Sequence, residues 1–196
     1  MALLAPRRSL RSRALQLLAQ REHSRAELRR KLIVHALAEL VAPGGPEAAD
    51  APAPAEPVER ADRAEQARLA ADRVEAELDW LESQRHLSAD RFVESRVHAR
   101  ASRFGNLRIR QELARHELGL PDEAAQSLKA SEFDRAVAVL ARKYPAAPTD
   151  AADRARRARF LAARGFSAET IRHAVRAAGT LDAELADRLD DAENLG

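Results

Sequence analysis

Three short turns with the same order of residue types recur along the chain, and they limit the possible folds more than any other feature. Each has a basic residue at an expected helix end, a tight turn and a polar residue suited to capping the next helix. The turns are Arg21-Glu22-His23-Ser24, Arg103-Phe104-Gly105-Asn106 and Arg164-Gly165-Phe166-Ser167. The caps lie 82 residues apart in the first interval and 61 in the second, a difference of 21. A tandem array of similar helical units, one of them interrupted, accounts for both spacings.

The residues between the turns follow helical periodicity. Leu28, Leu32 and Ala36 repeat at steps of four, and a second stripe, with Trp80 beside it as an expected core residue, runs through Val74, Leu78 and Leu81. Only 4% of residues are aromatic, glycines number seven, and no β-branched run reaches strand length. The predicted fold class is all-α, an elongated tandem array of three-helix, helix-turn-helix-like repeats.

Capping signals give the expected helix ends. Ser24 and Glu27 form a capping box, which predicts a helix that begins at Ser24. Gly105 is expected in the left-handed conformation after one helix, with Asn106 as the cap of the next. Ser167 is expected to cap a later helix.

The predicted domain organisation has five parts. Residues 1–9 are a basic leader, expected to be disordered, and 10–88 are a first three-helix repeat. That repeat is interrupted at about 42–58, where five prolines and two glycines cannot lie inside a helix. Residues 89–130 and 131–179 are the second and third repeats, and 180–196 are an acidic tail. For the tail, a docking helix and a frayed end both remain open.

Composition limits the class of protein. There is no cysteine, which excludes disulfides and thiolate chemistry, and no apolar run approaches the roughly 20 residues of a membrane span. The start lacks the apolar core of a secretory signal, so we expect a cytoplasmic protein. The net charge is only +2, but residues 1–40 carry +6 and residues 41–80 carry −6. Basic surface is therefore concentrated on particular helices.

Arginines at helical spacing form the candidate contact surface. The central cluster, which lies between residues 96 and 115, suits phosphates and acidic protein surface. An arginine cluster on a solvated helix is, however, often only solubilising. Glu112 fits an ordinary salt bridge to Arg108, four residues earlier. The candidates for contact with such a partner are Arg96, Arg100, Arg103, Arg108, Arg110, Arg115, Arg25, Arg29, Arg30, Arg156 and Arg157.

No pattern indicates catalysis. The six histidines lack metal-binding spacing, and no phosphate-binding glycine motif or nucleophile turn is present. We therefore expect no enzyme activity, no cofactor and no metal. The five phenylalanines lie among apolar neighbours and are expected in the core, so no base-stacking platform is predicted.

Three stretches resemble, in order, parts of one known family. The first runs from Ala14 to Leu32, the central one from Asp90 to Leu113, and the last from Arg159 to Ile171. Their matching residues include Ala14-Leu15-Gln16-Leu17-Leu18, Asp90-Arg91-Phe92-Val93, Arg108-Ile109, Glu112-Leu113, Arg159-Phe160-Leu161 and Arg164-Gly165-Phe166-Ser167. This order resembles the repeats of the RecX family over about residues 10–40 and 74–178. The insertion at 42–58 and the basic leader depart from the family pattern.

The resemblance implies a curved stack of repeats in the groove of a RecA–DNA filament. There the protein would restrain strand exchange, ATP hydrolysis and co-protease activity in DNA repair and the SOS response. We expect a monomer with weak non-specific nucleic-acid contact and no membrane contact. The alternative is a helix-turn-helix DNA-binding transcriptional regulator, with Leu107-Arg108-Ile109-Arg110-Gln111 starting its recognition helix.

Overall fold

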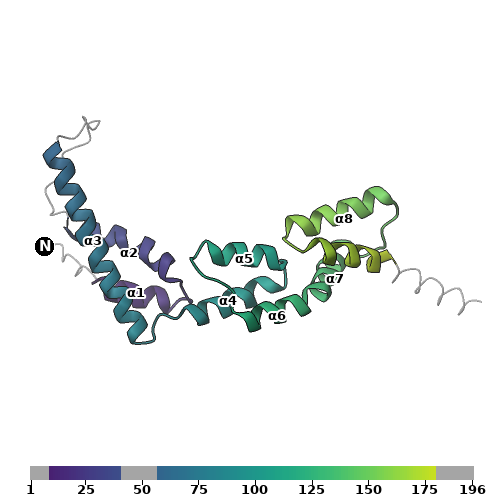
Figure 1. Cartoon of the computed structure of the whole chain (residues 1–196), viewed down its shortest axis with the longest axis horizontal. Helices are drawn as coiled ribbons and strands as arrows, with labels where there is room; N and C mark the ends of the chain where they lie inside the picture. Colours follow the sequence, from purple (N-terminus) through teal and green to yellow (C-terminus); the bar gives the residue numbers. More distant parts are fainter. Residues whose placement is uncertain (1–8, 41–56, 180–196) are drawn as a thin grey trace, which may run out of the picture. The chain divides into compact units, whose positions relative to one another are not determined.

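The computed structural model describes residues 9–40 and 57–179 (Figure 1). Every regular element in these two ranges is a helix, which confirms the all-α prediction. The chain divides into two compact units, residues 1–92 and 93–196, so the division falls inside helix α4 (Ala89–Ala101). None of the described helices combines the length and the apolar character that crossing a bilayer requires. The predicted leader (all but Ser9), most of the insertion and the acidic tail lie outside the described residues.

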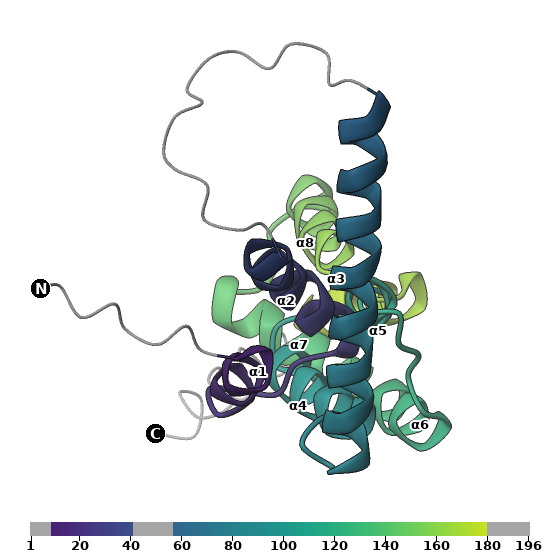
Figure 2. The same cartoon turned by 90° about the vertical axis from the view of Figure 1, so that its left-hand side faces the viewer.

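The first unit is built on three helices, α1 (Leu10–Leu18), α2 (Arg25–Leu40) and α3 (Pro57–Ser83), with α1 and α2 both in contact with α3 (Figure 2). Helix α3 begins at Pro57, slightly earlier than the sequence predicts, because proline is tolerated in the first turn of a helix. Over residues 61–83, where burial is described, its buried residues lie from Ala70 onward. The core consists of Leu10, Ala14, Leu28, Leu32, Ala36, Ala70, Val74, Leu78, Leu81 and Leu87.

Capping and aromatic contacts in this unit follow the sequence prediction. The Ser24 hydroxyl accepts a hydrogen bond of 3.1 Å from the backbone N–H of Glu27, at the start of α2. Trp80 packs at the edge of the core, where the guanidinium of Arg11 lies 3.7 Å from its ring centroid. This arrangement buries one face of the indole and gives the ring a cation–π contact.

Ion pairs join α2 to α3. Arg25 donates to Glu75 at 2.6 Å and to Glu82 at 2.7 Å, and Arg29 also binds Glu75. Hydrogen bonds from Arg29 lower the pKa of Glu75 to about 2 against the weaker opposing effect of burial. Burial raises the pKa of Glu27, but the hydrogen bond from Arg21 and nearby positive charges outweigh it and lower that pKa to about 2.

Acid is expected to destabilise the first unit through Glu27 and Glu75. Their folded-state pKa values of about 2 lie below the ordinary 4.5, so these groups bind protons more readily in the unfolded chain. Their contribution to stability is complete above pH 4.5 and is lost as the pH falls toward 2. Thermal unfolding followed by the fluorescence of Trp80 should therefore occur at progressively lower temperature across that window. Glu27→Gln should flatten the pH dependence; an unchanged slope would contradict the assignment to Glu27.

The second unit contains α5 (Asn106–Ala114), α6 (Asp122–Ala130), α7 (Glu132–Lys143), α8 (Ala151–Ala163) and a helical segment at 168–179, together with most of α4. One core cluster joins α7, α8 and the last segment through Leu140, Leu161, Phe166 and Val175. Ile109 and Leu113 of α5 are fully buried, and Leu128 of α6 is 4% exposed. The burial of Phe92 and Phe166 agrees with the core prediction, whereas Phe133 is 40% exposed.

Candidate anion-binding groove

The third recurrent turn is fixed by the way α8 ends. Gly165 has φ +78°, the left-handed conformation that glycine adopts without strain. The N–H of Phe166 donates to the carbonyl of Leu161 at 3.3 Å, and the N–H of Gly165 donates to that of Ala162 at 2.9 Å. These two bonds define a Schellman motif, which returns Phe166 to the core against Leu161.

The second turn lies directly against the third. The N–H of Gly105 donates to the carbonyl of Arg164, and that of Leu107 donates to the carbonyl of Gly165, both at 3.0 Å. A Cβ atom on Gly105 would lie 2.3 Å from three backbone atoms of Gly165 and Phe166. The prediction that Gly105 adopts the left-handed conformation is wrong. Gly105 has φ −78° and ψ 170°, so a close approach of two backbones requires glycine here.

A buried acidic side chain holds this junction together. Glu132, 5% exposed, accepts hydrogen bonds of 2.9 Å from the backbone N–H of Asn106 and from the Thr170 hydroxyl. Burial raises the pKa of Glu132, but the hydrogen bond from the Asn106 backbone, assisted by Ser167 and Thr170, outweighs it and lowers the pKa. The carboxylate therefore stays charged at neutral pH.

Arg135 of α7 binds the other side of the same turn. It donates to the carbonyls of Ala101 at 3.1 Å and Phe104 at 2.8 Å, and to the side-chain oxygen of Asn106 at 2.6 Å. Asn106 is thus the first residue of α5 and a partner of Arg135; the prediction that it caps the helix is wrong, and Gly105 occupies the cap position. With both sides held, the loop 102–104 faces α7 and α8.

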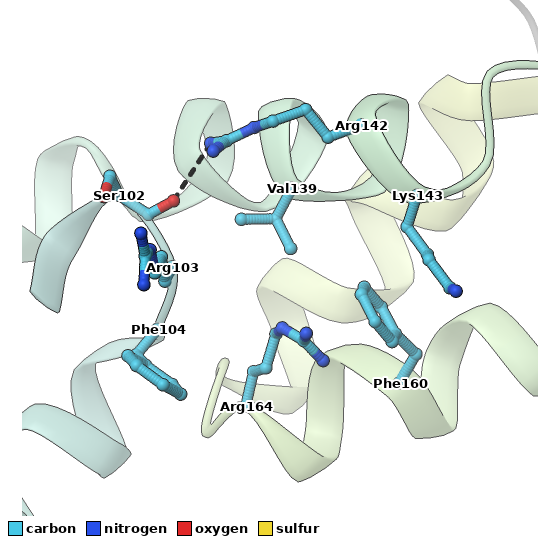
Figure 3. A pocket seen from close by; sticks show the side chains of 8 residues that line it. All are labelled: Ser102, Arg103, Phe104, Val139, Arg142, Lys143, Phe160 and Arg164. Atoms are coloured by element: carbon cyan, nitrogen blue, oxygen red, sulfur yellow. Dashed lines mark hydrogen bonds between the residues drawn. The ribbon is translucent and has the colours of Figure 1, made fainter.

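A cationic groove opens beside this junction (Figure 3). Its volume is about 370 Å³, and no carboxylate lies among the residues that line it. One guanidinium nitrogen of Arg142 donates to the carbonyl of Ser102 at 3.0 Å, and the Arg164 guanidinium lies 3.8 Å from the centre of the Phe160 ring. The groove residues are Ser102, Arg103, Phe104, Val139, Arg142, Lys143, Phe160 and Arg164. Four of them are cations, so the groove suits phosphate or carboxylate groups.

The central arginine cluster predicted from the sequence is divided in the structure. Arg100 of α4 makes a bidentate contact with Glu112 of α5 at 2.9 to 3.1 Å, and Arg96 lies 3.3 Å from the same carboxylate. The salt bridge predicted between Glu112 and Arg108 is replaced by this pairing between helices. Arg103, Arg108, Arg110 and Arg115 are exposed, and no carboxylate in the described ranges lies within salt-bridge distance of them.

The other predicted arginines have varied surroundings. Arg25 and Arg29 join α2 to α3 within the first unit, while Arg30 is exposed. Arg156 is 64% exposed and lies 3.5 Å from Asp153. Arg157 is only 3% exposed, binds Asp153 at 2.8 Å and lies over the Tyr144 ring, while its second terminal nitrogen is buried without a hydrogen-bond partner among the described residues.

Three groove cations were not among the candidates from the sequence: Arg142, Lys143 and Arg164. Arg142 and Lys143 end α7, where basic residues also complement the helix dipole, so their pattern has an ordinary explanation. Arg164 was noticed only as part of a turn. These cations come near Arg103 because the turns at Gly105 and Gly165, which are 60 positions apart in the sequence, approach each other closely.

The fold and the groove together define an all-helical repeat protein with a cationic surface groove, and among the described residues no cluster of side chains could hold a metal ion. The model of the third three-helix domain of RecX matches residues 130–175. "Regulatory protein RecX" of Ralstonia nicotianae is 42% identical over 88% of this chain and 90% of its own. The protein of the same name from Herbaspirillum seropedicae is 43% identical, over 87% and 91%. This chain belongs to the RecX family.

Proposed function

We propose that this protein binds the RecA–DNA filament and restrains its recombinase, ATPase and co-protease activities in DNA repair and the SOS response. Membership of a family of regulatory proteins carries this proposal, since the relatives match nearly nine-tenths of the chain. The protein would act by binding rather than by catalysis, as a cytoplasmic monomer. The predicted repeat boundaries at 10–88, 89–130 and 131–179 are part of the same proposal.

The cationic groove supports a contact with the filament. A RecA–DNA filament presents phosphates and acidic side chains, and four cations without a lining carboxylate complement both. Arg108 and Arg110 on α5, and Arg115 directly after it, extend the proposed contact surface beyond the groove. Arg96 and Arg100 would contribute less, because Glu112 already neutralises part of their charge. The proposed surface omits Arg157, which is buried.

The transcriptional-regulator alternative is not favoured. A recognition helix needs an accessible first turn to reach base edges. In α5 the first-turn N–H of Asn106 is bound to Glu132, and that of Leu107 is bound to the carbonyl of Gly165. Relatives that cover most of the chain carry the RecX name instead.

Reversing two groove charges should weaken filament binding. Arg103 and Lys143 are exposed, and no hydrogen bond or ion pair holds either side chain within the described parts of the chain, so Arg103→Glu with Lys143→Glu should leave the fold intact. Co-sedimentation with RecA filaments on single-stranded DNA should show affinity reduced on the order of tenfold, with a shallower salt dependence. The variant should slow the DNA-dependent ATPase of RecA less than the wild type does.

The matched control is Arg172→Glu with Arg176→Glu, which makes the same charge change at exposed positions outside the groove. It should bind more tightly than the groove variant. If the two double variants lose equal affinity, the groove is not the contact. If the wild-type protein neither co-sediments with the filament nor slows the ATPase over a wide titration, the proposed function itself is wrong.

A further inference from the structure

The cationic groove lacks the internal counter-charge that some other cations of this unit have. Arg100 is bound to Glu112, and Arg157 is bound to Asp153. In the groove, the nearest polar partner of Arg142 is the Ser102 carbonyl, and Arg164 lies on an aromatic ring. Four like charges around one volume of about 370 Å³ repel each other, so an anionic occupant would be favoured.

The chain itself supplies a suitable anion. Residues 180–196 contain six carboxylates and one arginine, a net charge of −5. This stretch, named here the acidic tail, has mainly alanine and leucine between its charges and no aromatic residue. The acidic positions are Asp182, Glu184, Asp187, Asp190, Asp191 and Glu193.

The place where the acidic tail leaves the fold puts the groove within reach. Gly179, the last described residue, lies against Pro148, since a Cβ atom on Gly179 would be 3.7 Å from Cγ of Pro148. Pro148 is five residues after Lys143, which lines the groove, so the chain path between them spans at most about 18 Å. The 17 residues of the tail can extend about 58 Å.

We propose that the acidic tail occupies the cationic groove of its own chain in the free protein, so that an external polyanion must displace it. A segment tethered this close has a high effective concentration, and therefore weak individual contacts suffice. Because the contacts are exposed charge pairs, the occupancy should fall steeply as salt rises. That the displacing polyanion is the RecA–DNA filament rests on the proposed function, but the intramolecular contact between the acidic tail and the groove does not.

The contact can be measured in the protein alone. The chain has no cysteine, so Ala192→Cys gives a single site for a nitroxide spin label in the full-length protein. At low salt we expect the label to broaden the backbone amide NMR signals of Arg103, Phe104 and Lys143. The broadening should disappear at high salt. It should also disappear when Asp187, Asp190, Asp191 and Glu193 are changed to the corresponding amides.

A binding assay tests the competition. Against a fluorescein-labelled oligothymidylate, neutralising the acidic tail should tighten binding about threefold or more, and this gain should vanish in the Arg103→Glu, Lys143→Glu background. Neutralising four exposed carboxylates elsewhere controls for net charge; they are Glu94, Asp122, Glu123 and Asp134.

Broadening that is absent, or that survives tail neutralisation, would overturn the proposal. An equal gain from the control carboxylates would overturn it too. Neither measurement contains RecA, so failure here leaves the proposed function standing. If the wild-type protein does not inhibit the ATPase of RecA, the proposed function is refuted, but the proposed contact between the acidic tail and the groove is not.

Discussion

Gly105→Ala should destabilise the second unit by about 3 kcal/mol. The added methyl group would lie 2.3 Å from the Gly165 carbonyl oxygen and from two backbone atoms of Phe166, and backbone cannot rotate away as a side chain can. The two turns would have to separate, which breaks both hydrogen bonds between them. Overpacking of this kind costs roughly 1–3 kcal/mol, and each lost buried hydrogen bond adds about 1 kcal/mol. Urea unfolding followed by circular dichroism measures the change.

Gly119→Ala is the matched control. Nothing lies within 4 Å of a Cβ atom built on Gly119, so alanine there should be neutral to within about 0.5 kcal/mol. Gly165→Ala provides a second variant at the junction, since it meets Arg108 at 2.6 Å and also strains a φ of +78°. If Gly105→Ala unfolds at the same urea concentration as Gly119→Ala, the two backbones do not approach as described.

The second large effect is expected at Glu132. Replacing it with alanine leaves the Asn106 N–H and the Thr170 hydroxyl without their acceptor. It also removes the carboxylate whose charge favours the partly buried Arg135 guanidinium. Removing one partner from a buried charged network typically costs about 3 kcal/mol or more. We therefore expect a loss of at least about 3 kcal/mol in the free energy of unfolding.

Glu132→Gln separates charge from hydrogen bonding. The amide keeps one acceptor oxygen of similar shape, so its cost should fall between those of the wild type and the alanine variant. Glu94→Ala, at an exposed position on α4, should change stability by less than about 0.5 kcal/mol. Equal unfolding free energies for Glu132→Ala and Glu94→Ala would show that the network contributes nothing.

Sequence patterns predicted the elements whose signals are local. The Ser24 cap, the stripes through Leu28 and Val74 and the turn at Gly165 depend on residues within one or two helical turns, and each is present. Helix periodicity and capping require only neighbours along the chain, which explains why the all-α fold was predictable.

The groove was only partly predictable, because its residues come from three separate segments. Arg103 was identified from its spacing, but Arg142 and Arg164 join it only through the packing of two distant turns. In the same way, helical spacing gave Glu112 a partner on its own helix, whereas α4 supplies Arg100. The sequence also gave no sign that Arg157 is buried, since Asp153 four residues earlier equally fits a surface ion pair.

The backbone bonds between the Gly105 and Gly165 turns have a consequence for how the protein opens. In many solenoids neighbouring modules share only side-chain contacts and can fray one at a time from an end. Here the amide protons of Gly105 and Leu107 are bonded to the carbonyls of Arg164 and Gly165, so they exchange with solvent only when the two turns separate. The segments that contain the two turns should therefore unfold together, in one cooperative step. The residues that line the groove would then stay in place until that step occurs.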